Sequence, residues 1–164
     1  MRVPLHAMAT VTLLALTQLL GSCMGPMPRP IGPLNSRLEA LGANREPSLS
    51  GRWLALISGR GGREQVMLLD LVNQQAQFLS GLNRADAQPL SVSIDAAGEK
   101  IALVRQLEGR TELVLYRRSL QSLQPIAMVP DGVPKAVQLQ ADGRQLAVQV
   151  SRNGIWQVDL VQIP

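Results

Sequence analysis

The chain has 164 residues, of which 46% are hydrophobic, 17% charged and 2% aromatic, and its formal net charge is +4. These values exclude an intrinsically disordered chain, and the length suits one domain with a core of its own. The single His and the single Cys, His6 and Cys23, both lie near the N-terminus, so the rest of the chain has no residues for a His-based triad, a Cys nucleophile or a zinc site.

An apolar run over residues 8–20 follows the early positive charge of Arg2. A short basic start, an apolar middle and small residues before a cleavage point are typical of a secretory signal peptide. The run has 13 residues, whereas a helix needs roughly 20 to span a bilayer. The sequence therefore predicts a cleaved signal peptide over residues 1–22 in preference to a permanent transmembrane helix.

The four residues Leu20-Gly21-Ser22-Cys23 resemble the bacterial lipobox, in which a branched apolar residue and two small residues precede a lipidated Cys. The resemblance implies that Cys23 carries the lipid and becomes the first residue of the mature chain. Two or more acyl chains anchor a protein stably to a membrane. We therefore expect a lipid-anchored protein of the bacterial cell envelope that faces the periplasm. The alternative is an ordinary signal peptide with an incidental Cys.

Residues 23–45 are predicted to form a tether. Four prolines lie between Pro26 and Pro33, and proline fixes φ and removes a backbone donor, which favours extended chain. The segment 35–41 could form one helical turn or irregular chain. The sequence therefore predicts a spacer that holds the following domain away from the membrane.

The rest of the chain, residues 46–164, contains a segment that repeats three times. Each copy has a turn glycine, two mostly polar residues, a large aliphatic residue and Ala, followed by further strand-like residues. The glycines Gly51, Gly98 and Gly143 are 47 and 45 residues apart. A second apolar run follows each copy after a hairpin signal such as Asn153-Gly154, so each repeat is predicted to contain an antiparallel hairpin.

Three or four short strands in a period of about 45 residues are the signature of β-propeller blades. The central runs over 54–57 and 66–69 are apolar on both faces, as expected for a sheet that is stacked between neighbouring sheets. We therefore predict an all-β fold with three consecutive propeller blades, a partial propeller, over residues 46–164. The alternative is a plain antiparallel sandwich of about ten strands.

The repeated turn resembles the Ser-Pro-Asp-Gly-Lys/Arg turn of the TolB-type β-propeller repeat family. The third copy, Ala141-Asp142-Gly143-Arg144, matches this turn except for its proline, whereas the copies at 95–99 and 49–52 are more divergent. The strand-ending Asp of the family is matched at Asp70 and Asp159. Structural roles in the repeated turns are therefore predicted for Gly51, Gly98, Asp142 and Gly143.

The resemblance to TolB also implies a non-enzymatic protein of an envelope complex. TolB proteins have six such repeats, whereas this chain has three, and propellers typically need four to eight blades to close a ring. Three blades would leave one apolar blade face uncovered at each end, and such faces favour association. We therefore expect either a homodimer that completes a six-bladed propeller or docking onto a propeller-like partner.

The sequence thus predicts a non-enzymatic, lipid-anchored envelope protein that binds a protein partner. A peptidoglycan- or glycan-binding module is the alternative, but such sites usually need exposed aromatic rings, and all four aromatic residues outside the signal peptide are predicted to pack in the core. They are Trp53, Phe78, Tyr116 and Trp156. No catalytic residue, metal site or cofactor is predicted, and no nucleic acid is expected because stacking rings are few.

Overall fold

The computed structural model describes residue 25 and residues 27–164, which divide into two units, Met1–Ile31 and Gly32–Pro164. The predicted signal peptide over 1–22 and the predicted lipid site Cys23 lie outside the described residues. The described part of the first unit has no helix or strand. Among the residues that the structure describes, no helix has both the length and the apolar character needed to cross a membrane.

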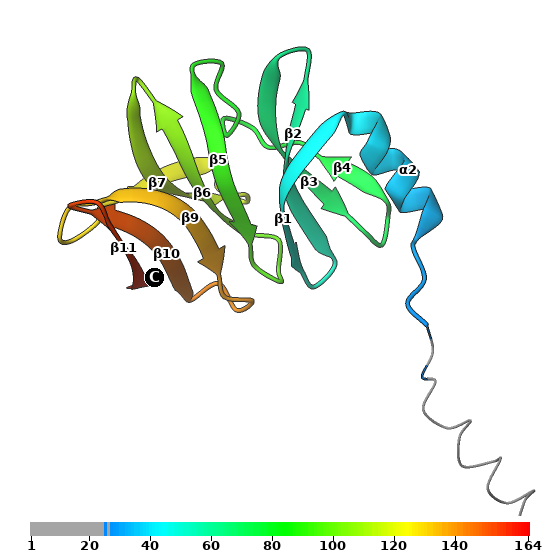
Figure 1. Ribbon diagram of the computed structural model, residues 1–164. Coiled ribbons are helices and arrows are strands. Elements are labelled where there is room, and N and C mark those ends of the chain that lie inside the picture. The colour runs from blue at the N-terminus through cyan, green and yellow to red at the C-terminus, as the bar shows by residue number, and fades with distance from the viewer. Residues whose placement is uncertain (1–24, 26) are drawn as a thin grey trace, which may run out of the picture. The chain divides into compact units, whose positions relative to one another are not determined.

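The second unit consists of one helix and three antiparallel sheets, which are arranged like propeller blades (Figure 1). The helix is α2 (Gly32–Leu41). Blade 1 contains β1 (Ala43–Ser50), β2 (Trp53–Arg60), β3 (Arg63–Asp70) and β4 (Gln75–Gln77). Blade 2 contains β5 (Ala87–Ile94), β6 (Lys100–Leu107), β7 (Arg110–Arg117) and β8 (Ser122–Ile126). Blade 3 contains β9 (Val133–Leu139), β10 (Gln145–Arg152) and β11 (Ile155–Gln162). The predicted all-β fold with three consecutive blades is confirmed.

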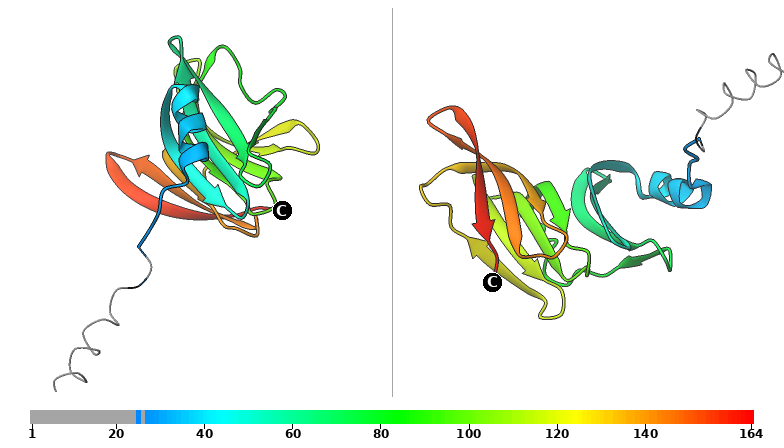
Figure 2. Two further views of the ribbon diagram at one scale, coloured as in Figure 1. Left: turned by 90° about the vertical axis from the view of Figure 1, so that its right-hand side faces the viewer. Right: turned by 90° about the horizontal axis from the view of Figure 1, so that it is seen from below.

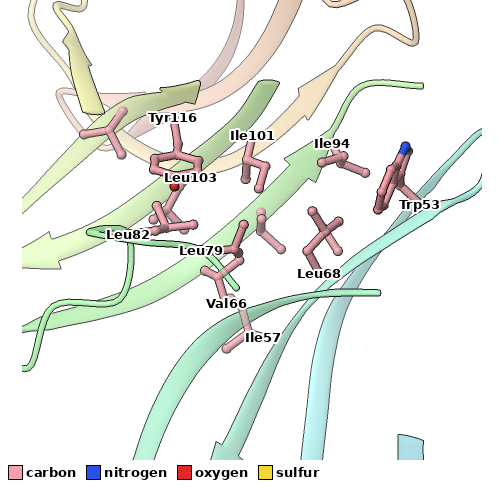
Figure 3. Packing of buried hydrophobic residues seen from close by; sticks show 13 residues of the cluster. Trp53, Ile57, Val66, Leu68, Leu79, Leu82, Ile94, Ile101, Leu103 and Tyr116 are labelled. Carbon is pink, nitrogen blue, oxygen red and sulfur yellow. The ribbon is translucent and has the colours of Figure 1, made fainter. Parts of the chain in front are cut away.

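The blades are held together by two hydrophobic clusters, one on each side of blade 2. The first cluster lies between blades 1 and 2 and includes Ile57, Leu68, Ile94 and Tyr116 (Figure 3). The second lies between blades 2 and 3 and includes Leu115. Successive residues of a strand point to opposite faces of its sheet, so the continuous apolar runs of blade 2 supply both clusters.

The innermost strands of the blades, β1, β5 and β9, lie side by side. Strand β5 contacts all of the first three strands of blade 1, and β9 contacts the first three strands of blade 2. Neighbouring innermost strands belong to different sheets, so some of their backbone groups need side-chain partners. The N–H of Ile94 donates to Oγ of Ser48 at 3.2 Å, and the N–H of Leu139 donates to Oγ of Ser93 at 2.8 Å.

The region predicted as a tether over 23–45 is structured in its second half. Helix α2 begins at Gly32 and β1 at Ala43, so blade 1 starts before the predicted boundary at residue 46. Pro33 is tolerated because the first turn of a helix does not use its N–H groups. Gly42 follows the helix with φ of 108°, a conformation that suits a helix C-terminus because glycine has no Cβ.

Helix α2 covers part of one of the two blade faces that were predicted to be uncovered. It packs against β1 and β2, and Leu34 of the helix is buried. Figure 2 shows the helix beside blade 1 in both views. The backbone oxygen of Leu41 also accepts a hydrogen bond from Oγ of Ser58 at 3.1 Å. The expectation of one bare face at each end is therefore only partly correct at the blade 1 end, where the helix contacts β1 and β2 but Leu49 stays exposed.

The predicted equivalence of Asp70 and Asp159 is also wrong. Asp70 lies opposite Trp53, and the residue in the same position of blade 3 is Gln162, opposite Gln145. Asp159 lies in the middle of β11 and forms an ion pair with Arg152, whose Nη1 is 2.9 Å from its Oδ1. The apolar runs of β3 and β11 differ in register by three residues, which a comparison of the sequence alone did not detect.

Candidate functional site

The three turn glycines occupy equivalent positions in the blades. Gly51, Gly98 and Gly143 each lie two positions before the first residue of the second strand of their blade and have φ of 57°, 69° and 68°, a left-handed conformation that favours glycine. Each also lies against a neighbouring blade: a Cβ on Gly98 would be 2.4 Å from the ring of Trp53. The predicted turn residue Asp142 accepts a hydrogen bond from the N–H of Arg144 at 2.9 Å. This end of the unit is therefore built by turn-to-turn packing.

Several acidic side chains are held as anions by arginines. The side chain of Arg52 lowers the pKa of Asp70 to about 2, and backbone N–H groups of Val72 and Asn73 contribute. Arg84 likewise lowers the pKa of Asp86 to about 2. A general acid needs a pKa near the working pH, so these carboxylates suit ion pairing and not proton transfer. Within the described residues, no group of three or more His, Cys, Asp and Glu side chains could hold a metal ion.

We expect the Asp70→Asn variant to be less stable than the parent chain at neutral pH. Because the folded pKa of Asp70 lies below its ordinary value of 3.8, the ion pair stabilises the fold above about pH 4 and loses this effect as the pH falls through about 2. Thermal unfolding midpoints of both chains between pH 7 and pH 2 measure this. The difference between the two unfolding midpoints should shrink as the pH falls from 4 to 2. A difference that stays constant over this range would show that the charge of Asp70 does not cause the loss of stability.

The outer face of blade 3 is an exposed apolar surface. The equivalent faces of blades 1 and 2 are covered by the next blade. In the paired register, Leu160 lies opposite Ala147, as Leu115 lies opposite Ala102 and Leu68 opposite Ala55. Leu68 and Leu115 are 0% and 1% exposed because the next blade covers them, whereas Leu160 is 77% exposed. Val158 and Trp156, on the same face of β11, are also exposed. Blade 3 thus presents the packing residues of a blade face, and within residues 27–164 no further blade covers them.

A hollow of about 470 Å³ lies beside this face. It is lined by residues of the three innermost strands, Leu49 among them, by the turn residues Gln140 and Ala141, and by residues of β10 and β11 that include Ala147 and Leu160. None of the lining residues is charged. Its polar lining consists of Ser and Gln side chains, including Ser48, Ser93 and Gln138. Such a surface suits an uncharged ligand that combines apolar side chains with hydrogen-bonding groups.

The outer edge of β11 is open as well. The N–H of Ile163 donates to the backbone oxygen of Arg144 at 2.7 Å. Backbone hydrogen bonding alternates along an antiparallel strand, so the backbone groups of Val158 and Leu160 point to the open edge. In blades 1 and 2 the corresponding edges are paired with β4 and β8, and among the described residues blade 3 has no fourth strand.

A larger hollow, of about 610 Å³, lies on blade 1 beside the segment 85–88. Two of its charged lining residues already have partners: Glu64 forms an ion pair with Arg45, and Asp86 forms one with Arg84. Exposed ion pairs contribute little and need no ligand to satisfy them. The open face of blade 3, with its unpaired strand edge and uncovered apolar residues, is therefore the stronger candidate for a binding surface.

The prediction that all four aromatic residues pack in the core is correct for Trp53 and Tyr116, which are buried. It is wrong for Phe78 and Trp156, which are exposed. Nζ of Lys135 lies 4.8 Å from the centre of the Trp156 ring. Trp156 lies in the same kind of apolar run as the buried Tyr116, so the sequence alone gave no signal that separates these two rings. Phe78 follows the short strand β4.

No family model and no curated protein matches the chain. Among solved structures, TolB from Acinetobacter baumannii is similar, with a TM-score of 0.58 and 19% identity over 74% of this chain and 30% of that one. The β-propeller domain of the Trilobed protease from Pyrococcus furiosus is similar with a TM-score of 0.50 and 16% identity, over 76% of this chain and 43% of that one. The chain has a TolB-type β-propeller-like fold.

The TolB-type fold explains the packing of the three blades but not the exposed face of blade 3. The chain spans less than half the length of either similar structure, and in a propeller each blade face is normally covered by the next blade. One of the two similar structures is a domain of a protease, and at these identities the likeness shows the fold alone. A functional argument must therefore rest on the surface that this chain exposes.

Proposed function

We propose that the chain is a non-enzymatic, lipid-anchored protein of the bacterial envelope that faces the periplasm and binds a protein partner through the open face of blade 3. The observation that carries this proposal is the exposure of Leu160 and Val158, beside the exposed Trp156, at positions where blades 1 and 2 have buried residues. These buried residues are Leu68, Leu115, Val66 and Leu113. Apolar patches of this kind mark protein interaction sites. The lipobox-like residues before Cys23 and the TolB-type fold support the location.

A glycan-binding module remains the second candidate because of one observation. Trp156 is 51% exposed and lies on the same face as Leu160, and aromatic rings are the usual platforms for sugars. The neighbouring surface, however, consists of aliphatic side chains such as Val158 and Leu160. Aliphatic side chains match the apolar side chains of a protein better than the hydroxyl groups of a sugar, so the protein partner is the preferred proposal.

The proposal is tested by placing a photo-crosslinking amino acid at Trp156 in the full-length chain in intact cells. We expect adducts of discrete protein mass that contain this chain. The matched control is the same amino acid at Phe78, which is exposed but lies outside blade 3, and it should give few adducts. Adducts with glycan fragments only, or equal yields at the two positions, would contradict the proposal.

A further inference from the structure

We propose that the partner at the open face of blade 3 is a second copy of this chain, whose Leu49 packs on Ala147 and Leu160. This inference rests on the proposed function, because it names the protein partner that the face binds. Used twice between two copies, the same contact would join blade 3 of each copy to blade 1 of the other. Two sets of three blades make six, which lies within the usual range for a closed propeller.

The face of blade 3 shows what kind of element would cover it. Within the chain, each covered blade face is crossed by the innermost strand of the next blade: β5 contacts β1, β2 and β3, and β9 contacts β5, β6 and β7. Ile94 of β5 and Leu139 of β9 are buried in these two contacts. The equivalent face of blade 3 therefore fits an innermost strand that carries a large aliphatic residue at this position.

Strand β1 has such a residue, Leu49, and its side chain is exposed. Leu49 lies opposite Leu54, as Ile94 lies opposite Ile101 and Leu139 opposite Leu146. Ile94 and Leu139 are 1% and 5% exposed, whereas Leu49 is 69% exposed. One chain thus exposes both halves of a single type of blade contact, one half on blade 1 and the other on blade 3.

Hydrogen bonding supports the same pairing. Ser48, Ser93 and Gln138 occupy equivalent positions, because they lie opposite Ala55, Ala102 and Ala147. The oxygens of the two serines accept hydrogen bonds from the N–H groups of Ile94 and Leu139 on the next innermost strand. Gln138 is exposed, and its amide oxygen can accept the equivalent bond from the N–H of Leu49 of a second copy.

Charge and helix α2 are compatible with this contact. The hollow beside Ala147, which Ser48 and Leu49 of the same chain also line, has no charged lining residue. The Pro47-Ser48-Leu49 segment of a second copy can therefore approach Ala147 and Leu160 without an unpaired charge. Helix α2 precedes β1 as the segment 78–86 precedes β5, and it contacts β1 and β2 while Leu49 stays exposed. Leu79 and Leu82 of that segment are likewise buried next to an inter-blade contact.

The test is the mass in solution of residues 32–164, the unit that contains both hydrophobic clusters, by light scattering at about 100 µM, well above the Kd of a micromolar contact. We expect a species of twice the mass of one chain. The variants Leu49→Lys and Leu160→Lys should each be monomeric. The control Val72→Lys changes an equally exposed residue, since Val72 is also 69% exposed, and it should remain a dimer. Circular dichroism confirms that each variant is folded.

Mixing the two monomeric variants makes the test specific for this geometry. The Leu49→Lys chain keeps an intact blade 3 face and the Leu160→Lys chain keeps an intact Leu49, so the mixture should form a heterodimer through one good contact. A contact between two blade 3 faces would not be rescued in this way. A monomeric parent chain, or a dimer that is unaffected by Leu160→Lys, overturns the inference. If the parent is monomeric while Trp156 still crosslinks to another protein in cells, only the proposed function stands.

Discussion

Replacing Gly98 with alanine should destabilise the fold by about 3 kcal/mol or more. The left-handed backbone, with φ of 69°, alone costs a non-glycine residue roughly 1–2 kcal/mol. The added Cβ would lie 2.4 Å from the ring of Trp53. This ring cannot easily move, because it is buried in the first hydrophobic cluster and the guanidinium carbons of Arg118 and Arg52 lie 4.5 and 5.2 Å from its centre.

The matched control is Gly109→Ala in the hairpin between β6 and β7. Gly109 has a similar φ of 75°, but a Cβ there would have no atom within 4 Å. We therefore expect a loss of about 1–2 kcal/mol, from the backbone conformation alone. Urea unfolding of the parent and both variants measures the two losses. Equal losses would show that the contact between Gly98 and Trp53 contributes nothing to stability.

Replacing Glu112 with glutamine should cost about 2–3 kcal/mol, because it leaves the buried charge of Arg105 without its anion. Nε of Arg105 donates to Oε1 of Glu112 at 2.7 Å, and the two side chains are 8% and 32% exposed. Nη1 of Arg105 is buried and has no hydrogen-bond partner among the described residues. The carboxylate of Glu112 is thus the main compensation for a cation that burial disfavours.

The reverse substitution should behave differently. Arg105→Met removes the buried cation and its unpaired N–H, and it leaves Glu112, which is about one-third exposed and can be hydrated. We expect a change in the free energy of unfolding within about 1 kcal/mol, in either direction. Denaturant unfolding of both single variants measures the asymmetry. Comparable large losses in the two variants would mean that the pair is a net stabilising interaction.

Much of the fold could be predicted from the sequence because the strongest signals are local. A turn that needs a positive φ requires glycine, so Gly51, Gly98 and Gly143 marked the start of the second strand in every blade. Hairpin signals such as Asn153-Gly154 and runs that are apolar on both faces then gave the strand pairs. These features depend on short-range geometry and on burial between sheets, and both are expressed directly in residue type.

The features that could not be predicted depend on contacts between distant residues. The prolines around α2 favoured extended chain, and the burial of Leu34 against blade 1 is a tertiary contact that outweighs this preference. Trp156 and Leu160 lie in an apolar run like those of β3 and β7, so only the absence of a covering element in the structure distinguishes them. The candidate site is therefore visible as a set of packing residues in the sequence, but its exposure is not.

Blade 2 contributes residues to both hydrophobic clusters of the unit. Ile101 and Leu103 of β6 contribute to the first cluster, and Ala102 and Val104 contribute to the second. Stability in stacked repeats is approximately a sum of nearest-neighbour terms. Detachment of blade 3 would therefore leave the first cluster whole, whereas loss of blade 2 would abolish both. Local opening should begin at the outer blades, and the amides of β6 and β7 should be the last to exchange with solvent.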